Sequence, residues 1–138
     1  HSEFGWLRQA YGDFAGSEQY FDMALRLSPR DPFRFVDLLG LGIVYRYVYE
    51  NAERALEFYR RSYDVYPWSW TQICLISAYA AAGRMDEARM LLKTYLNGKP
   101  LVDSIAMVRK NLNSYHPDYV RRIEPLFVGL RLAGMPEG

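Results

Sequence analysis

Few side chains in this sequence have the residue type and spacing that catalysis or metal binding requires. His116 is the only histidine apart from His1, and because it stands directly before Pro117 we interpret it as a helix-start residue and not as a metal ligand. Cys74 is the only cysteine and lies in the apolar run Ile73–Ile76. We predict that it is a small buried hydrophobe, since a reactive thiol needs an electropositive site.

The charged residues also lack a reactive pattern. Asp86-Glu87 lie at an expected helix start, where the helix dipole favours acidic side chains. Gly98-Lys99 has no glycine five residues before it, and Pro100 stands where a phosphate-binding loop needs Ser or Thr. Arg109-Lys110 and Arg121-Arg122 would form a small basic patch, and we interpret them as solvated helix faces. The sequence thus predicts no catalytic residue, no metal and no cofactor, and we expect no enzymatic activity in this chain.

The composition is that of one globular domain. Hydrophobic residues make up 50% of the 138 residues, which is enough for a sizeable core. Lys and Arg total 17 against 16 Asp and Glu, and this balance argues against nucleic-acid binding. The sequence has no run of about 18 apolar residues that would span a membrane, and its single cysteine fits a reducing cytoplasm. His1-Ser2 has the appearance of residues added by cloning, so we expect a fragment of a longer protein.

Four residue types recur in the same order three times along the chain. The order is small, aromatic or large apolar, small, and proline, spaced four, three and five residues apart, with Tyr95 at the small third position of the last copy. The copies are Ser17, Phe21, Ala24 and Pro29; Ala55, Tyr59, Ser62 and Pro67; and Ala88, Leu92, Tyr95 and Pro100. A period near 34 residues with these types resembles the tetratricopeptide repeat.

The resemblance implies an all-α fold, a right-handed superhelical array of about three helix pairs. The repeats would cover residues 3–31, 32–67 and 68–100, and a capping helix pair in residues 101–138 would close the open end of the array. Gly12-Asp13 has the residues of a turn between helices, and Asn51 is expected to cap the second helix of the middle repeat. A long first helix is expected from Phe33 to Tyr49, with Pro32 able to occupy its first turn. Pro125 is expected to kink or restart the last helix.

Two short segments resemble one particular family of proteins that contain such repeats. The loop Leu27–Pro32, LSPRDP, and the tail Gly129–Glu137, GLRLAGMPE, are similar to the C-terminal repeat region of bacterial class III adenylate/guanylate cyclases. That family has Lys and Leu where this chain has Leu132 and Met135. The resemblance implies a regulatory domain beside a cyclase catalytic domain, and support for a homodimer. Similar arrays end some winged-helix transcription regulators, so a scaffold of that kind or a stand-alone adaptor remains the alternative.

The first helices of such an array line a concave groove that binds a protein or peptide. By register with the family, the groove residues are Trp6, Gln9, Asp37, Leu41, Val44, Tyr47, Trp70, Ile73 and Ser77. Arrays of this family that bind the C-terminal carboxylate of a chaperone hold it with Lys, Arg and Asn at these positions. None of the nine residues is basic or Asn, so we do not expect this chain to bind such a carboxylate. The aromatic and aliphatic set suits an amphipathic helix. Alternatively, Tyr47 and Trp70 pack against the capping helices.

Overall fold

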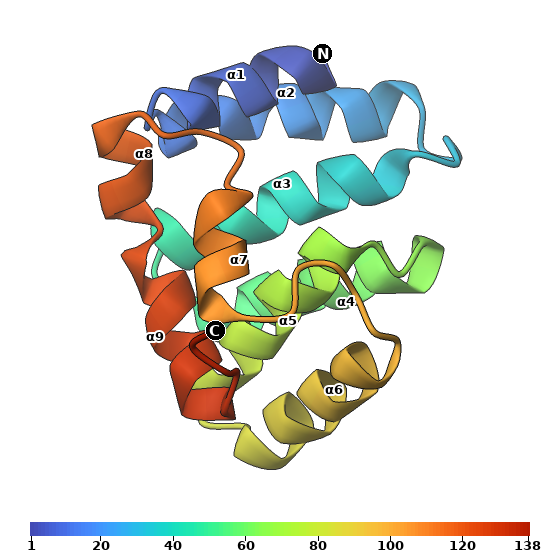
Figure 1. Cartoon of the computed structure of the whole chain (residues 1–138). Helices are drawn as coiled ribbons and strands as arrows, with labels where there is room; N and C mark the ends of the chain where they lie inside the picture. The colour runs from blue at the N-terminus through green and yellow to red at the C-terminus, as the bar shows by residue number, and fades with distance from the viewer.

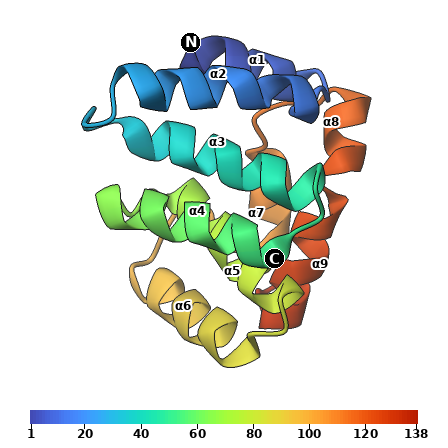
Figure 2. The same ribbon diagram turned by 180° about the vertical axis from the view of Figure 1, so that it is seen from behind.

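The computed structural model describes all 138 residues as nine α-helices without a β-strand, which confirms the all-α prediction (Figure 1). The helices are α1 (Ser2–Ala10), α2 (Phe14–Leu27), α3 (Arg34–Tyr47), α4 (Ala52–Val65), α5 (Ser69–Ala81), α6 (Met85–Asn97), α7 (Ile105–Lys110), α8 (Pro117–Arg122) and α9 (Glu124–Ala133). The first six helices form three consecutive hairpins, one in each predicted repeat segment. Each hairpin contacts the next through α2 and α3 or through α4 and α5, so that the three hairpins stack (Figures 1 and 2).

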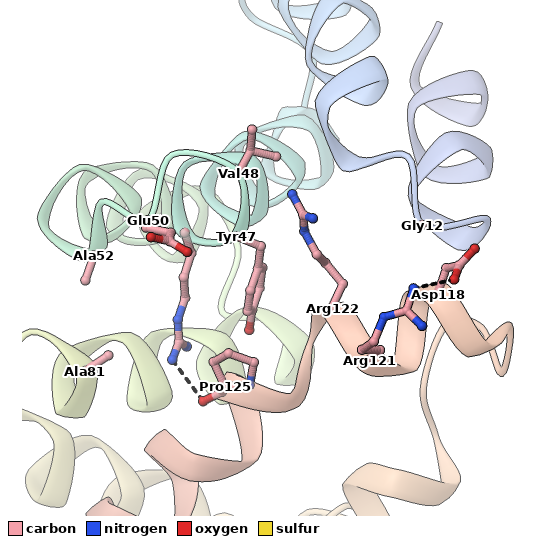
Figure 3. A pocket seen from close by; sticks show the side chains of 11 residues that line it. Gly12, Tyr47, Val48, Glu50, Ala52, Ala81, Asp118, Arg121, Arg122 and Pro125 are labelled. Atoms are coloured by element: carbon pink, nitrogen blue, oxygen red, sulfur yellow. Dashed lines mark hydrogen bonds and ion pairs between the residues drawn. The ribbon is translucent and has the colours of Figure 1, made fainter.

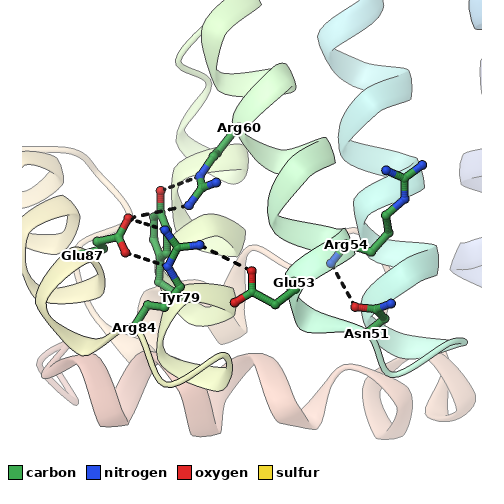
Figure 4. Close-up of polar contacts among 7 residues, drawn as sticks. All are labelled: Asn51, Glu53, Arg54, Arg60, Tyr79, Arg84 and Glu87. Carbon is green, nitrogen blue, oxygen red and sulfur yellow. Dashed lines mark hydrogen bonds and ion pairs between the residues drawn. The ribbon is translucent and has the colours of Figure 1, made fainter.

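A glycine turn and polar capping residues separate the two helices in the first two hairpins. Gly12 has a φ of +89°, which glycine adopts without a steric cost. Asp13 then caps α2, its Oδ1 accepting a hydrogen bond from the Gly16 amide at 2.9 Å. Asn51 caps α4 in the same way, with its Oδ1 3.0 Å from the amide nitrogen of Arg54 (Figure 4). The predicted turn and cap are therefore confirmed at both sites.

Phe21 of α2 shows how the hairpins pack. Its ring is fully buried and lies against the backbone of two glycines on neighbouring helices. A Cβ added to Gly5 of α1 would lie 2.8 Å from the ring, and one added to Gly40 of α3 would lie 2.5 Å from it. The two glycines therefore let α1 and α3 approach the same aromatic side chain from both sides.

The structure differs from the prediction at two places. Helix α3 begins at Arg34 and ends at Tyr47, so Pro32 lies before the helix and not in its first turn; the Asp31 carboxylate accepts the Phe33 amide there and holds a turn. The C-terminal region contains three helices instead of two. Helices α8 and α9 run down one side of the stack, and α9 packs mainly on α5, not on the outer end of α6 (Figures 1 and 2).

Tyr59 lies at the centre of the main core and carries a hydroxyl without a hydrogen-bond partner. A buried unsatisfied hydroxyl costs free energy, so we expect Tyr59→Phe to stabilise the fold by about 1 kcal/mol. Tyr95 provides the matched control, because its hydroxyl donates to the Val102 carbonyl, and Tyr95→Phe should lose a similar amount of stability. Urea denaturation measures both. Destabilisation by Tyr59→Phe would show that its hydroxyl is satisfied in solution.

Candidate functional site

Seven of the nine predicted groove residues are buried, so the prediction of an open groove is wrong for them. The seven are Gln9, Asp37, Leu41, Val44, Tyr47, Ile73 and Ser77, each no more than 9% exposed. Only Trp6 and Trp70 are partly exposed, and both pack against the main core. Two different causes bury the seven residues.

The first cause is the C-terminal region, whose helix α9 packs on α5. The hydroxyl of Ser77 donates to the carbonyl oxygen of Leu126 at 2.8 Å and accepts from Nη1 of Arg46 at 2.7 Å. Nη2 of Arg46 donates to the Pro125 carbonyl oxygen at 3.0 Å, the bond drawn at Pro125 in Figure 3. Ser77 and Arg46 thus fasten the start of α9 to α5 and α3.

The second cause is the register of the first helices. Leu41 points between α2 and α4, where it packs with a cluster that contains Phe21. The amide of Gln9 donates to the Ser17 hydroxyl at 3.1 Å. Asp37 accepts a 2.5 Å hydrogen bond from the Ser2 hydroxyl, while burial raises the pKa of its carboxyl. These residues hold the hairpins together and present no surface to a partner.

Tyr47 is buried, and its ring packs on a helix of the first hairpin. Its ring makes an edge contact with Phe14, with 5.9 Å between centroids, and burial raises its pKa. It also borders a cavity together with Pro125 of α9. Tyr47 is therefore not an exposed anchor for a partner.

An exposed aromatic cluster lies at one edge of the stack, where the α2–α3 and α4–α5 connections meet. Phe35 is at its centre, with its ring 5.0 Å from Tyr66, 5.8 Å from Trp68 and 6.2 Å from Phe33, measured between centroids. Phe33 is 69% exposed, Tyr66 53% and Trp68 36%. We name Phe33, Phe35, Tyr66 and Trp68 the aromatic edge.

A recess of about 350 Å³ adjoins the aromatic edge. It is lined by Trp6, Val36, Trp68 and Asn113, which come from α1, α3, the start of α5 and the α7–α8 connection. Trp6, one of the predicted groove residues, is the one that reaches this recess. Sequence reasoning did not identify the other residues of the recess or the aromatic edge. The available signal was the position of the aromatic residues next to prolines: Phe33 follows Pro32, and Tyr66 and Trp68 flank Pro67.

A larger cavity of about 790 Å³ lies between the ends of α3 and α8 and the starts of α4 and α9 (Figure 3). Its charged lining residues are Arg46, Glu50, Asp118, Arg121 and Arg122. Arg46 is only 7% exposed, whereas the other four are exposed. The basic pair Arg121-Arg122 was predicted to be a solvated face, and it is solvated on the rim of this cavity.

A charged network on α4, α5 and α6 ties the second and third hairpins together (Figure 4). Arg84 contacts Glu87 at 2.6 Å and Glu53 at 3.5 Å, and Arg60 donates to the Tyr79 hydroxyl at 3.0 Å. All the charged members are partly or well exposed, so each ion pair contributes little to stability. We interpret the network as solvent-exposed contacts between the second and third hairpins.

The two side chains considered first as reactive groups, His116 and Cys74, have structural roles. His116 caps α8, its Nδ1 accepting from the Asp118 amide at 3.2 Å, which confirms a helix-start residue. Cys74 is buried as predicted, and burial raises the pKa of its thiol to about 12. The structure contains no group of three or more His, Cys, Asp or Glu side chains placed to hold a metal ion. None of its helices combines the length and the apolar character that crossing a membrane requires.

Comparison with known proteins gives no family assignment. The chain matches no protein-family model, and it matches no curated protein. Its surfaces and their chemistry are therefore the basis on which a function is proposed.

Proposed function

We propose that this chain is a protein-interaction domain of the tetratricopeptide type, which binds an apolar peptide or helix of a partner protein at the aromatic edge and its recess. The observation that carries the proposal is the exposure of Phe33, Tyr66 and Trp68 in one contiguous cluster. Aromatic side chains supply much of the energy of protein interfaces because each buries a large rigid surface. The repeat pattern and the stacked hairpins support the assignment to a repeat domain.

The recess gives the partner a place to insert a side chain. Trp6, Val36 and Trp68 provide apolar walls, and the Asn113 side chain brings donors and acceptors for a peptide backbone. An extended or helical segment with one large apolar anchor would fill the recess and cover the aromatic edge beside it. The recess is lined by the same helices, α1, α3 and α5, as the predicted groove, whereas α9 covers that face at Ser77.

The experiment compares binding by two variants that lose a similarly exposed apolar side chain. A partner retained by the immobilised chain is identified by mass spectrometry and then titrated against the wild type, Trp68→Ala and Met90→Ala. We expect Trp68→Ala to weaken binding about thirtyfold, the loss typical of a central aromatic anchor. Met90 is 73% exposed on α6, away from the aromatic edge, and its replacement should leave the affinity unchanged. Equal affinities for the wild type and Trp68→Ala would contradict the proposed site.

We further propose that the domain belongs to a bacterial nucleotide cyclase and regulates it, on the resemblance of Leu27–Pro32 and Gly129–Glu137 to that family. The parent reading frame tests this part. A class III catalytic domain encoded upstream would support it, whereas a winged-helix domain there would favour the transcription-regulator alternative. An open reading frame without either domain would favour a stand-alone adaptor.

A further inference from the structure

The cavity bordered by α3, α4, α8 and α9 contains a buried cation without a carboxylate partner. Arg46 is 7% exposed, and no Asp or Glu oxygen lies within ion-pair distance of its guanidinium. Its two hydrogen bonds go to neutral acceptors, the Ser77 hydroxyl and the Pro125 carbonyl oxygen. Buried charges in proteins are normally paired, because removing a charge from water is costly.

The titratable groups near Arg46 do not supply the missing negative charge. Tyr47 stacks beside the guanidinium, 5.3 Å from the ring centroid, and burial raises the pKa of its hydroxyl. Burial also raises the pKa of the Cys74 thiol to about 12, although the charge of Arg46 opposes this shift. Both side chains are therefore neutral at physiological pH, and Arg46 keeps its charge uncompensated.

Apart from Arg46, the charges of the lining cancel, with Arg121 and Arg122 against Glu50 and Asp118. Arg122 forms no ion pair, whereas Arg121 is paired with Asp118 at 2.5 Å. Glu50 lines the cavity as well and also forms no ion pair, so the opposing charge is one carboxylate against two free guanidinium groups. The balance favours an anion.

We infer that this cavity binds a small organic anion through a phosphate or carboxylate group held by Arg46, while the positive charge of Arg122 on the rim attracts the anion. Two of the five N–H groups of Arg46 serve Ser77 and Pro125, which leaves donors for the oxygen atoms of a ligand. A volume of about 790 Å³ accommodates a metabolite-sized molecule and not only its charged group. Because the lining comes from α3, α4, α8 and α9, the bound anion would stabilise the packing of the C-terminal helices on the stack.

The test is thermal denaturation of the full chain in increasing phosphate and, separately, succinate, with sodium chloride at matched ionic strength as the reference. We expect a saturable rise in Tm with at least one of the two anions and none with chloride. The anion that saturates at lower concentration identifies the ligand class as phosphate ester or carboxylate. The absence of a saturable response to both anions would overturn the inference.

Variants locate the response in the cavity. Arg122→Gln, at an exposed position, should leave the fold intact and weaken anion binding about fivefold, the effect of losing a nearby positive charge. Glu50→Gln removes the opposing carboxylate and should strengthen binding. Arg89→Gln is the matched control, since Arg89 is exposed on α6 without an ion pair and lies outside the cavity. Equal responses of Arg122→Gln, Arg89→Gln and the wild type would overturn the inference, because the effect would then be general screening.

Discussion

Gly129→Ala is expected to lower the free energy of unfolding by about 3 kcal/mol and to loosen α9 from α5, an overpacking effect in a closed interface. A Cβ at position 129 would lie 2.2 Å from Oγ of Ser77, 2.5 Å from its carbonyl oxygen and 2.9 Å from its Cα. Two of these three atoms belong to the backbone of α5, so a side-chain rotation cannot relieve the contact. The hydrogen bond from Ser77 to the Leu126 carbonyl would be strained by the same shift.

Urea denaturation and amide hydrogen exchange together measure this effect. We expect exchange to accelerate in α9 while amides of α1 and α2 keep their protection, since those helices do not depend on this contact. Val128→Ala is the control on the neighbouring position, where the side chain is 53% exposed and its loss should change stability by at most about 0.5 kcal/mol. Wild-type stability in Gly129→Ala would mean that α9 does not lie against Ser77.

The contact of Gly129 with Ser77 bears directly on function. If α9 moves away, the buried face of α5 around Ile73 and Ser77 opens and becomes the groove that the repeat register predicts. The aromatic edge, by contrast, lies on the α2–α3 and α4–α5 connections and would persist. Partner binding that depends on Trp68 and survives Gly129→Ala would therefore separate the two surfaces.

The parts of the fold that sequence reasoning predicted depend on residues close together in the chain. Gly12 and Asp13 form a turn and a cap within four residues, and Asn51 caps the helix that starts beside it. Pro125 restarts a helix at Glu124 because proline tolerates the first turn and not the interior.

The covering of the first-helix face could not be predicted in this way, because it depends on partners distant in sequence. Ser77 bonds a residue 49 positions away, and Arg46 bonds one 79 positions away. A small polar residue on an inner helix face is compatible both with an open groove and with a closely packed helix. The arginine in the apolar helix α3 was a signal, since a cation there needs a buried acceptor, but the sequence does not identify that acceptor.

Phe21→Ala is expected to produce the largest loss of stability, about 4 kcal/mol, by leaving a cavity at the centre of the first two hairpins. The ring is fully buried between Gly5 and Gly40 and meets Trp6 edge-on at 5.2 Å between centroids. Glycines offer no side chains that could move into the vacated space. Leu38, Leu41 and Phe58 also pack in this cluster, and the cost should lie within the range for a deleted phenyl ring.

Phe4→Ala removes the same group from the adjacent helix and provides the control. Phe4 is 58% exposed and contacts Tyr20 at 5.7 Å between centroids, so its loss should cost less than about 1 kcal/mol. Urea denaturation of both variants gives the difference directly. A similar small loss in the two variants would mean that the hairpins are not packed through Phe21. A large difference would place the Gly5–Phe21–Gly40 contact at the centre of the packing between the first two hairpins.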